Sequence, residues 1–109
     1  MNTGPNRNIE KAITLYIDQE LEEIIPGFLE NRRVDVQAIE TALQENNLSQ
    51  IQMIGHRLKG DGGGYGFDAI SAIGAALEQA AAREDRPAIR RLTAELIDFL
   101  GRVCVVYRR

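Results

Sequence analysis

The chain has 109 residues, of which 44% are hydrophobic and 27% are charged, and its formal net charge is −3. This composition is that of one ordinary globular domain, so it excludes a multidomain enzyme, a collagen-like fibre and a wholly disordered chain. With one histidine, one cysteine and no tryptophan, the chain can form neither an intrachain disulfide nor a metal site built on two histidines. The ten glycines are close to average usage, so their positions carry more information than their number.

Charge and hydropathy also limit the partners and the compartment. No run of Lys or Arg is longer than two residues, so we expect no nucleic-acid partner. No apolar run approaches the ~18 residues of a membrane span, so we expect no membrane partner. Cys104 stands in an apolar stretch, which predicts a small buried thiol. A lone cysteine without a signal peptide favours the cytoplasm.

The first segment of the chain is the least regular. Residues 1–8 are polar and contain Gly4 and Pro5, which is typical of a mobile lead. The run at residues 13–17 is compatible with a strand or with the start of a helix. Asp18 is a candidate N-cap, because the acidic residues that follow it suit the first turn of a helix. We therefore assign residues 1–17 to a partly mobile N-terminal extension, with an extra helix as the alternative, and residues 18–109 to the main domain.

Two long amphipathic helices follow. Pro26 suits a first helical turn, and the helix of roughly twenty residues that it opens ends at residues 45–47. Its apolar stripe consists of Phe28, Leu29, Val36, Ile39 and Leu43. Asn47 and Gln50 have the spacing of a capping box, so a second helix begins there and stops at Gly66. Its inward stripe consists of Ile51, Ile54, Leu58, Gly62 and Tyr65.

Two further helices complete the pattern. Asp68 is a candidate cap of the third helix, which ends at residues 83–86, and Pro87 suits the first turn of the last helix. The third stripe consists of Ile70, Ile73, Leu77 and Ala80 or Ala81. The fourth consists of Ile89, Leu92, Leu96, Phe99, Leu100 and Val103. Four stripes joined by short links predict an all-α, antiparallel four-helix bundle. A helical hairpin that dimerises is less economical, because one chain already supplies four stripes.

The segment from Gly60 to Gly66 breaks the ordinary rules for a helix. Five of the ten glycines lie in it, and four of these fall inside the helical pattern, where each costs about 1 kcal/mol relative to alanine. The helix could instead end near Lys59 and continue as a loop, or the glycines could serve close helix packing. A phosphate-binding loop is disfavoured, because its lysine would follow the glycines and a strand would precede them.

Helical geometry places the single histidine on the exposed side of the second helix. The residues that share its face are Gln52, Met53, Lys59, Gly60 and Gly63. Lys59 can hold an anion beside the imidazole, and the glycines clear a surface that another protein can approach. A largely neutral imidazole is a nucleophile at cellular pH, so this face suits a transferable phosphoryl group on a ring nitrogen.

The run His56-Arg57-Leu58-Lys59-Gly60, followed by Gly66, resembles the signature of histidine-containing phosphotransfer (HPt) domains. The ending at residues 65–67 is similar to that of the phosphotransfer domain of chemotaxis-type histidine kinases, and residues 26–32 and 77–81 extend the resemblance over most of the chain. Asp61 departs from the pattern, which usually has serine, alanine or glycine there. It either adds negative charge one turn from the site, where it would weaken a phosphorylated state, or points to solvent.

The resemblance assigns roles to the matching residues. It implies that His56 is the phosphoacceptor, that Lys59 stabilises the phosphoryl group and that Gly60 clears room for the partner. Glu78 matches a position whose carboxylate orients the histidine, although a solvated helix residue is an equal alternative. The small residues on its face, Ser71, Gly74 and Ala75, would let the third helix pack close to the second. We expect docking over the exposed face that includes Gln52, Met53 and Gly63.

The implied function is that of a cytoplasmic phosphorelay carrier. It would exchange a phosphoryl group with aspartates of response-regulator receiver domains, or take it from a histidine or hybrid kinase. We expect no enzyme activity of its own, no bound cofactor or metal, magnesium on the receiver, and a monomer. The alternative is a phosphate-independent helical module that modulates a histidine kinase. A metal-binding four-helix enzyme would need repeated Glu-x-x-His pairs, which one histidine forbids.

Overall fold

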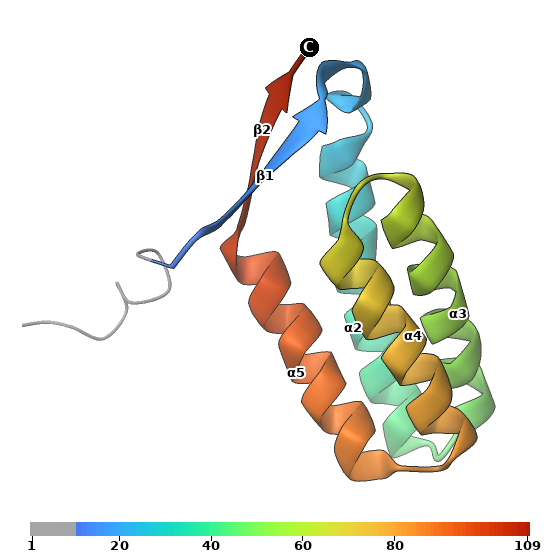
Figure 1. Ribbon diagram of the computed structural model, residues 1–109. Coiled ribbons are helices and arrows are strands. Elements are labelled where there is room, and N and C mark those ends of the chain that lie inside the picture. Colours follow the sequence, from blue (N-terminus) through green and yellow to red (C-terminus); the bar gives the residue numbers. More distant parts are fainter. Residues whose placement is uncertain (1–10) are drawn as a thin grey trace, which may run out of the picture.

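The computed structural model describes residues 11–109 and shows four helices in an up-and-down bundle (Figure 1). The helices are α2 (Ile25–Gln44), α3 (Leu48–Gly64), α4 (Asp68–Ala82) and α5 (Arg86–Arg102). The predicted antiparallel four-helix bundle is confirmed. The lead expected at residues 1–8 lies outside the described residues.

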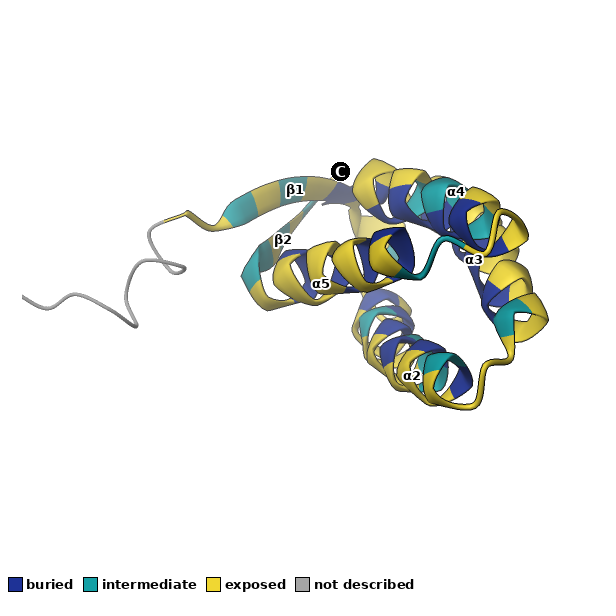
Figure 2. Ribbon diagram, turned by 90° about the horizontal axis from the view of Figure 1, so that it is seen from below, coloured by how far each residue is buried: buried dark blue, intermediate teal, exposed yellow. Residues whose placement is uncertain are grey.

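The four predicted stripes form one hydrophobic core. Buried residues lie on the side of each helix that faces the centre of the bundle, as Figure 2 shows. The residues from the stripes that are fully buried include Ile39, Ile51, Leu58, Leu77, Ile89 and Leu96. Burial of a large aliphatic side chain contributes roughly 1.5–3 kcal/mol, so these stripes fix which face of α3 remains outside.

Most predicted helix ends are confirmed by their capping contacts. The Asn47 side chain accepts a hydrogen bond from the Gln50 N–H, and Asp85 accepts one from the Ala88 N–H. Gly66 has a φ of +86°, which a residue with a Cβ adopts only with strain. The prediction for Asp68 was wrong, because Phe67 is the N-cap of α4 and Asp68 lies in the first helical turn. There its charge still complements the helix dipole.

The prediction that Asp18 is an N-cap is confirmed, and the helix that it caps is short. The Asp18 side chain accepts a hydrogen bond from the Glu20 N–H at 2.8 Å, and this contact opens only the short 3-10 helix η1 (Gln19–Leu21). A turn follows, and α2 begins separately at Ile25, with Pro26 in its first turn. Proline suits that position because the first N–H groups of a helix have no partner within it.

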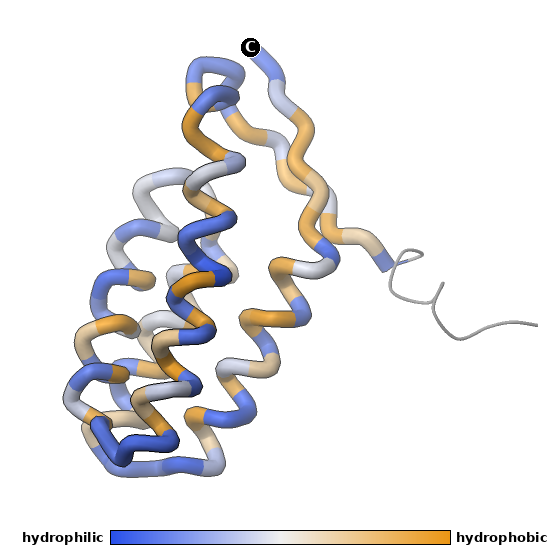
Figure 3. The backbone as a smooth tube through the Cα atoms, turned by 180° about the vertical axis from the view of Figure 1, so that it is seen from behind, coloured by the Kyte–Doolittle hydropathy of each residue, from blue (hydrophilic) through white to orange (hydrophobic). Residues whose placement is uncertain are grey.

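A two-stranded parallel ribbon lies beside the end of α5 (Figures 1 and 3). Its strands are β1 (Ile13–Asp18) and β2 (Val103–Arg108), in register from Ile13 opposite Val103 to Asp18 opposite Arg108. Residues 13–17 therefore belong to a strand. This strand continues through Asp18, the residue at which the main domain was predicted to begin. In both strands, alternate side chains pack against the helical core.

The ribbon bears on two predictions at the C-terminal end. Val103 packs against the core as predicted, but it is half-buried and is the first residue of β2 rather than part of α5. Cys104 is exposed, so the predicted buried thiol was wrong. Successive side chains of a strand point to opposite faces, and Cys104 falls on the outward face. In the part of the chain that is described, no helix combines the length and apolarity needed to span a membrane.

Candidate functional site

The close approach of α3 to α4 explains two of the glycines of α3. A Cβ added at Gly55 would lie 2.6 Å from the Glu78 amide nitrogen, and one added at Gly62 would lie 2.6 Å from the Ser71 amide nitrogen. Both positions therefore require glycine. Because α3 continues to Gly64, the loop alternative was wrong. The close-packing interpretation is confirmed for Gly62, whereas a Cβ at Gly60 or Gly64 would meet no atom within 4 Å.

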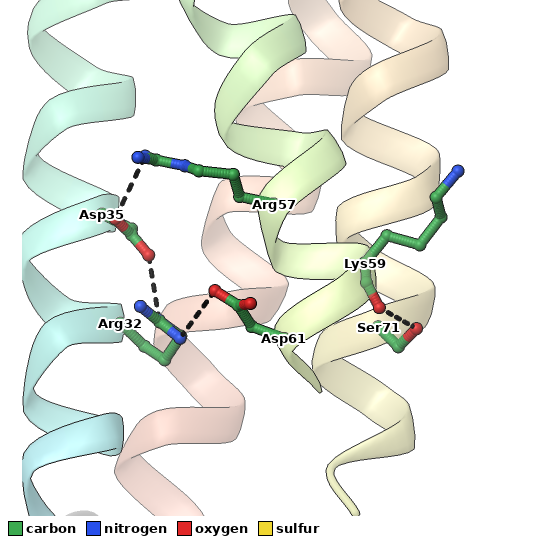
Figure 4. A network of polar contacts seen from close by, with 6 residues as sticks. All are labelled: Arg32, Asp35, Arg57, Lys59, Asp61 and Ser71. Atoms are coloured by element: carbon green, nitrogen blue, oxygen red, sulfur yellow. Dashed lines mark hydrogen bonds and ion pairs between the residues drawn. The ribbon is translucent and has the colours of Figure 1, made fainter. Parts of the chain in front are cut away.

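The small residues predicted on α4 form the other half of this contact. A Cβ at Gly74 would lie 2.5 Å from the Lys59 amide nitrogen. The Ser71 hydroxyl donates a hydrogen bond to the Lys59 carbonyl oxygen at 2.7 Å, drawn in Figure 4. This contact ties the glycine-rich half of α3 to α4 next to the predicted site.

The tight packing places Glu78 between His56 and Lys59. Its Oε2 lies 3.0 Å from His56 Nδ1, and its Oε1 lies 3.2 Å from Lys59 Nζ. The hydrogen bond from Lys59 lowers the pKa of Glu78 below its ordinary value; desolvation opposes this effect, and the hydrogen bond with His56 adds to it. Glu78 is therefore ionised at neutral pH. The structure brings together the three side chains to which the sequence assigned chemistry.

The imidazole remains open to solvent on its outer side. The His56 side chain is 67% exposed. A carboxylate accepts hydrogen bonds only, so the contact with Glu78 requires a proton on Nδ1. Nε2 is then the nitrogen with the free lone pair. Among residues 11–109, Nε2 has no hydrogen-bond partner.

The surface around His56 consists of a hollow beside the ring and of exposed glycines further along α3. A hollow of about 410 Å³ beside the ring is lined by Ser49, Gln52, Met53, Arg57 and Glu78. Gln52 and Met53 therefore lie together with His56, as the sequence predicted. Gly60 and Gly63 do not line this hollow. They are exposed further along α3, and a Cβ at Gly60 would meet no atom within 4 Å.

The site therefore combines an oriented imidazole, a neighbouring ammonium group and an approachable helix surface. The family model described as the Hpt domain matches residues 17–104 of this chain. The chain belongs to the Hpt domain family. Hpt domains transfer phosphoryl groups through a histidine in phosphorelay signalling, and they are carriers rather than enzymes. Neither a search of curated proteins nor one of solved structures found a match.

Two features of this Hpt domain were not identified from the sequence. The first is Gly55, which stands seven residues before Gly62 on the same stripe, a spacing that could have revealed it. The second is a polar network on the α2 side of α3, formed by Arg32, Asp35, Arg57 and Asp61 (Figure 4). No metal cluster of three or more His, Cys, Asp or Glu side chains occurs within residues 11–109.

The Asp61 side chain is half exposed to solvent, and it also makes a contact that the sequence did not predict. Its Oδ2 lies 3.8 Å from Nη1 of Arg32 on α2. Figure 4 shows Asp61 directed toward α2, while the Lys59 side chain extends along the opposite side of α3. In this Hpt domain the extra carboxylate thus faces a buried arginine rather than the histidine.

Proposed function

We propose that His56 of this Hpt domain accepts a phosphoryl group on Nε2 and exchanges it with the aspartate of a receiver domain. The observation that carries this proposal is the contact of 3.0 Å between Glu78 Oε2 and His56 Nδ1 on a ring that is largely exposed. A proton held on Nδ1 leaves the Nε2 lone pair free to attack phosphorus.

The step is an in-line displacement. The Nε2–P bond forms while the O–P bond of the receiver's aspartyl phosphate breaks, and the aspartate leaves as a carboxylate. The ring gains positive charge as its lone pair is shared with phosphorus, and the Nδ1 proton stays in place. Glu78 lies where its negative charge stabilises the ring at that moment. The magnesium would be held by the receiver, and we expect no cofactor on this chain.

Lys59 supplies the positive charge for the phosphoryl group. Its ammonium group pairs with Glu78 at 3.2 Å, and its side chain is about half exposed. This flexible side chain can turn toward a phosphoryl group on the neighbouring histidine, because residues three apart share a helix face. The phosphorylated form would thus keep a counter-charge within one helical turn.

The docking surface of the receiver would be the exposed face of α3. Gln52 and the exposed Met53 offer polar and apolar contact beside the ring. Gly60 and Gly63 would admit the partner's backbone beyond Lys59, because neither carries a side chain. A histidine or hybrid kinase is the other expected partner, and we expect a monomer in the cytoplasm.

The test is incubation of the purified chain with a receiver that carries a labelled phosphoryl group. We expect the label on the wild-type chain and none on His56→Gln, since a glutamine on this exposed face preserves the fold. Equal label on both proteins would overturn the proposal. Binding to the kinase without label on either protein would support the phosphate-independent module instead.

A further inference from the structure

Three side-chain contacts join α2 to the C-terminal half of α3, residues 57–65 including its C-cap. They recur about once per helical turn. They are Phe28 with Tyr65 (ring centroids 4.8 Å apart), Arg32 with Asp61 (3.8 Å) and Asp35 with Arg57 (3.8 Å). Because the helices are antiparallel, the residue numbers rise on α2 as they fall on α3. We call this set of contacts the α2–α3 ladder; it lies on the side of α3 that faces away from α4.

Arg32 is the fixed centre of the ladder. It is buried, with 8% of the residue exposed, and its Nε lies 2.9 Å from Asp35 Oδ2. Its guanidinium also lies over the ring of Phe28, 4.5 Å from the centroid, in the geometry of a cation–π contact. Burial raises the pKa of Asp35, and the charges of Arg32 and Arg57 oppose that shift. An arginine held from two sides has little freedom, so it forms a firm support for a third contact.

The glycine-rich turn needs such a support. Residues 60–64 read Gly-Asp-Gly-Gly-Gly, so Asp61 carries the only side chain in that stretch. On its other side the turn packs through backbone, at Gly62 against α4. Within residues 60–64, α2 can therefore contact a side chain only at Asp61, while the contact of Phe28 with Tyr65 holds the residue that follows the turn. In an α-helix the N–H groups of this turn also bond to the carbonyls one turn earlier, including that of Lys59.

We propose that Asp61 is a positioning residue for the phosphotransfer proposed above. Its contact with Arg32 keeps the turn at residues 60–64 helical and thereby holds the backbone of Lys59 in place beside His56. The inference rests on the proposed function for its second half, the effect on transfer. Its first half, the effect on the helix, is independent of that function.

The first experiment compares amide hydrogen exchange of residues 60–65 in the wild type and in Asp61→Ala. Alanine is the better helix former, so helix propensity alone predicts slower exchange in the variant. The ladder predicts exchange about two- to five-fold faster, the range of an exposed ion pair. Asp98→Ala is the matched control, because Asp98 is about equally exposed (51% against 52%) and also pairs with an arginine, Arg102. It should leave residues 60–65 unchanged.

The second experiment measures transfer from a phosphorylated receiver. We expect Asp61→Ala to lower kcat about two- to five-fold and to leave KM unchanged, because the Asp61 side chain faces α2. Asp61→Glu should restore kcat, since it keeps the carboxylate. Slower or unchanged exchange in Asp61→Ala would overturn the proposal. A longer-lived phosphohistidine in this variant would also overturn it, because that result is expected if Asp61 acts by repelling the phosphoryl group. A wild-type chain that accepts no label would overturn the proposed function, while the exchange result would still decide the role of the ladder.

Discussion

Gly55 on α3 and Gly74 on α4 bring the two backbones into contact. A Cβ at Gly74 would lie 2.7 Å from the Gly55 carbonyl oxygen, and one at Gly55 would lie 2.8 Å from the Gly74 carbonyl oxygen. His56 directly follows the first glycine, and Glu78 stands one turn after the second. The contact of 3.0 Å between His56 and Glu78 thus depends on a helix separation that two missing side chains permit.

Gly74→Ala should therefore separate α3 from α4. Overpacking of a tight contact costs typically 1–3 kcal/mol, so we expect the free energy of unfolding to fall by about that amount, measured with urea. Transfer should fall as well, because Glu78 moves away from His56. Gly27→Ala is the control, since a Cβ there meets no atom within 4 Å. A Gly74→Ala protein as stable as the wild type would contradict this account of the contact.

The bundle could be predicted because its signals are local. Stripes with helical spacing, the capping pair Asn47 and Gln50, and Gly66 are all read within one or two turns of chain, and the structure confirms them. The role of Glu78 was predicted from the family resemblance. Its proximity to His56 was predicted from the small residues on the same face of its helix. The site geometry thus followed from a short motif and from helix packing.

The ribbon and the ladder could not be predicted in the same way. The strand at residues 13–17 pairs with a segment at the opposite end of the chain. A local sequence pattern cannot predict a strand partner that is so far away in the sequence. The exposure of Cys104 depends on that pairing. Arg32 and Asp61 meet because α2 and α3 pack with one particular rotation about their axes. The apolar stripes predict which face of each helix is buried, but they do not predict which side chains meet across the contact.

Lys59→Ala should slow phosphoryl transfer while the fold is kept. The lysine is about half exposed and its ion pair with Glu78 lies at the surface, so its loss should change the stability by at most about 1 kcal/mol. A missing counter-charge at the reacting group should lower the transfer rate on the order of tenfold or more. Rapid-quench kinetics with a phosphorylated receiver measure the rate, and Lys11→Ala is the control. An unfolded Lys59→Ala protein would show that the lysine is structural.

Removal of the Glu78 carboxylate should change which nitrogen of His56 carries the proton. Glu78 Oε2 faces Nδ1, so Glu78→Ala should shift the neutral ring away from the Nδ1–H form, as measured by ¹⁵N NMR. Glu78→Gln keeps an acceptor without the charge, so it should retain more of that form but slow transfer several-fold. Gln79→Ala changes the exposed neighbour on the same helix and should have neither effect. An unaltered tautomer in Glu78→Ala would argue against an orienting role.

The contribution of Glu78 to stability should depend on pH in a defined direction. Lys59 and His56 lower the pKa of Glu78 in the folded protein below its ordinary value of 4.5. A carboxyl group with a lowered pKa stabilises the fold above its unfolded-state pKa, and this stabilisation is lost as the pH falls through the folded-state value. The wild type should be more stable than Glu78→Gln at pH 7, and the difference should be smaller at pH 3. Urea unfolding of both proteins at the two pH values measures it; a difference that is the same at both would refute the assignment.

A side chain at position 60 should leave the fold intact but weaken the complex with the receiver. A Cβ there meets no atom within 4 Å, and alanine is favoured over glycine inside a helix by about 1 kcal/mol. Gly60→Ala should therefore raise the free energy of unfolding by up to that amount. Gly60→Gln should fold equally well yet raise the KM for the phosphorylated receiver about tenfold, because its side chain occupies the surface that the partner approaches. Gly101→Gln adds the same side chain at an open position of α5 and should leave the KM unchanged. If the two glutamine variants transfer equally well, the partner does not dock over Gly60.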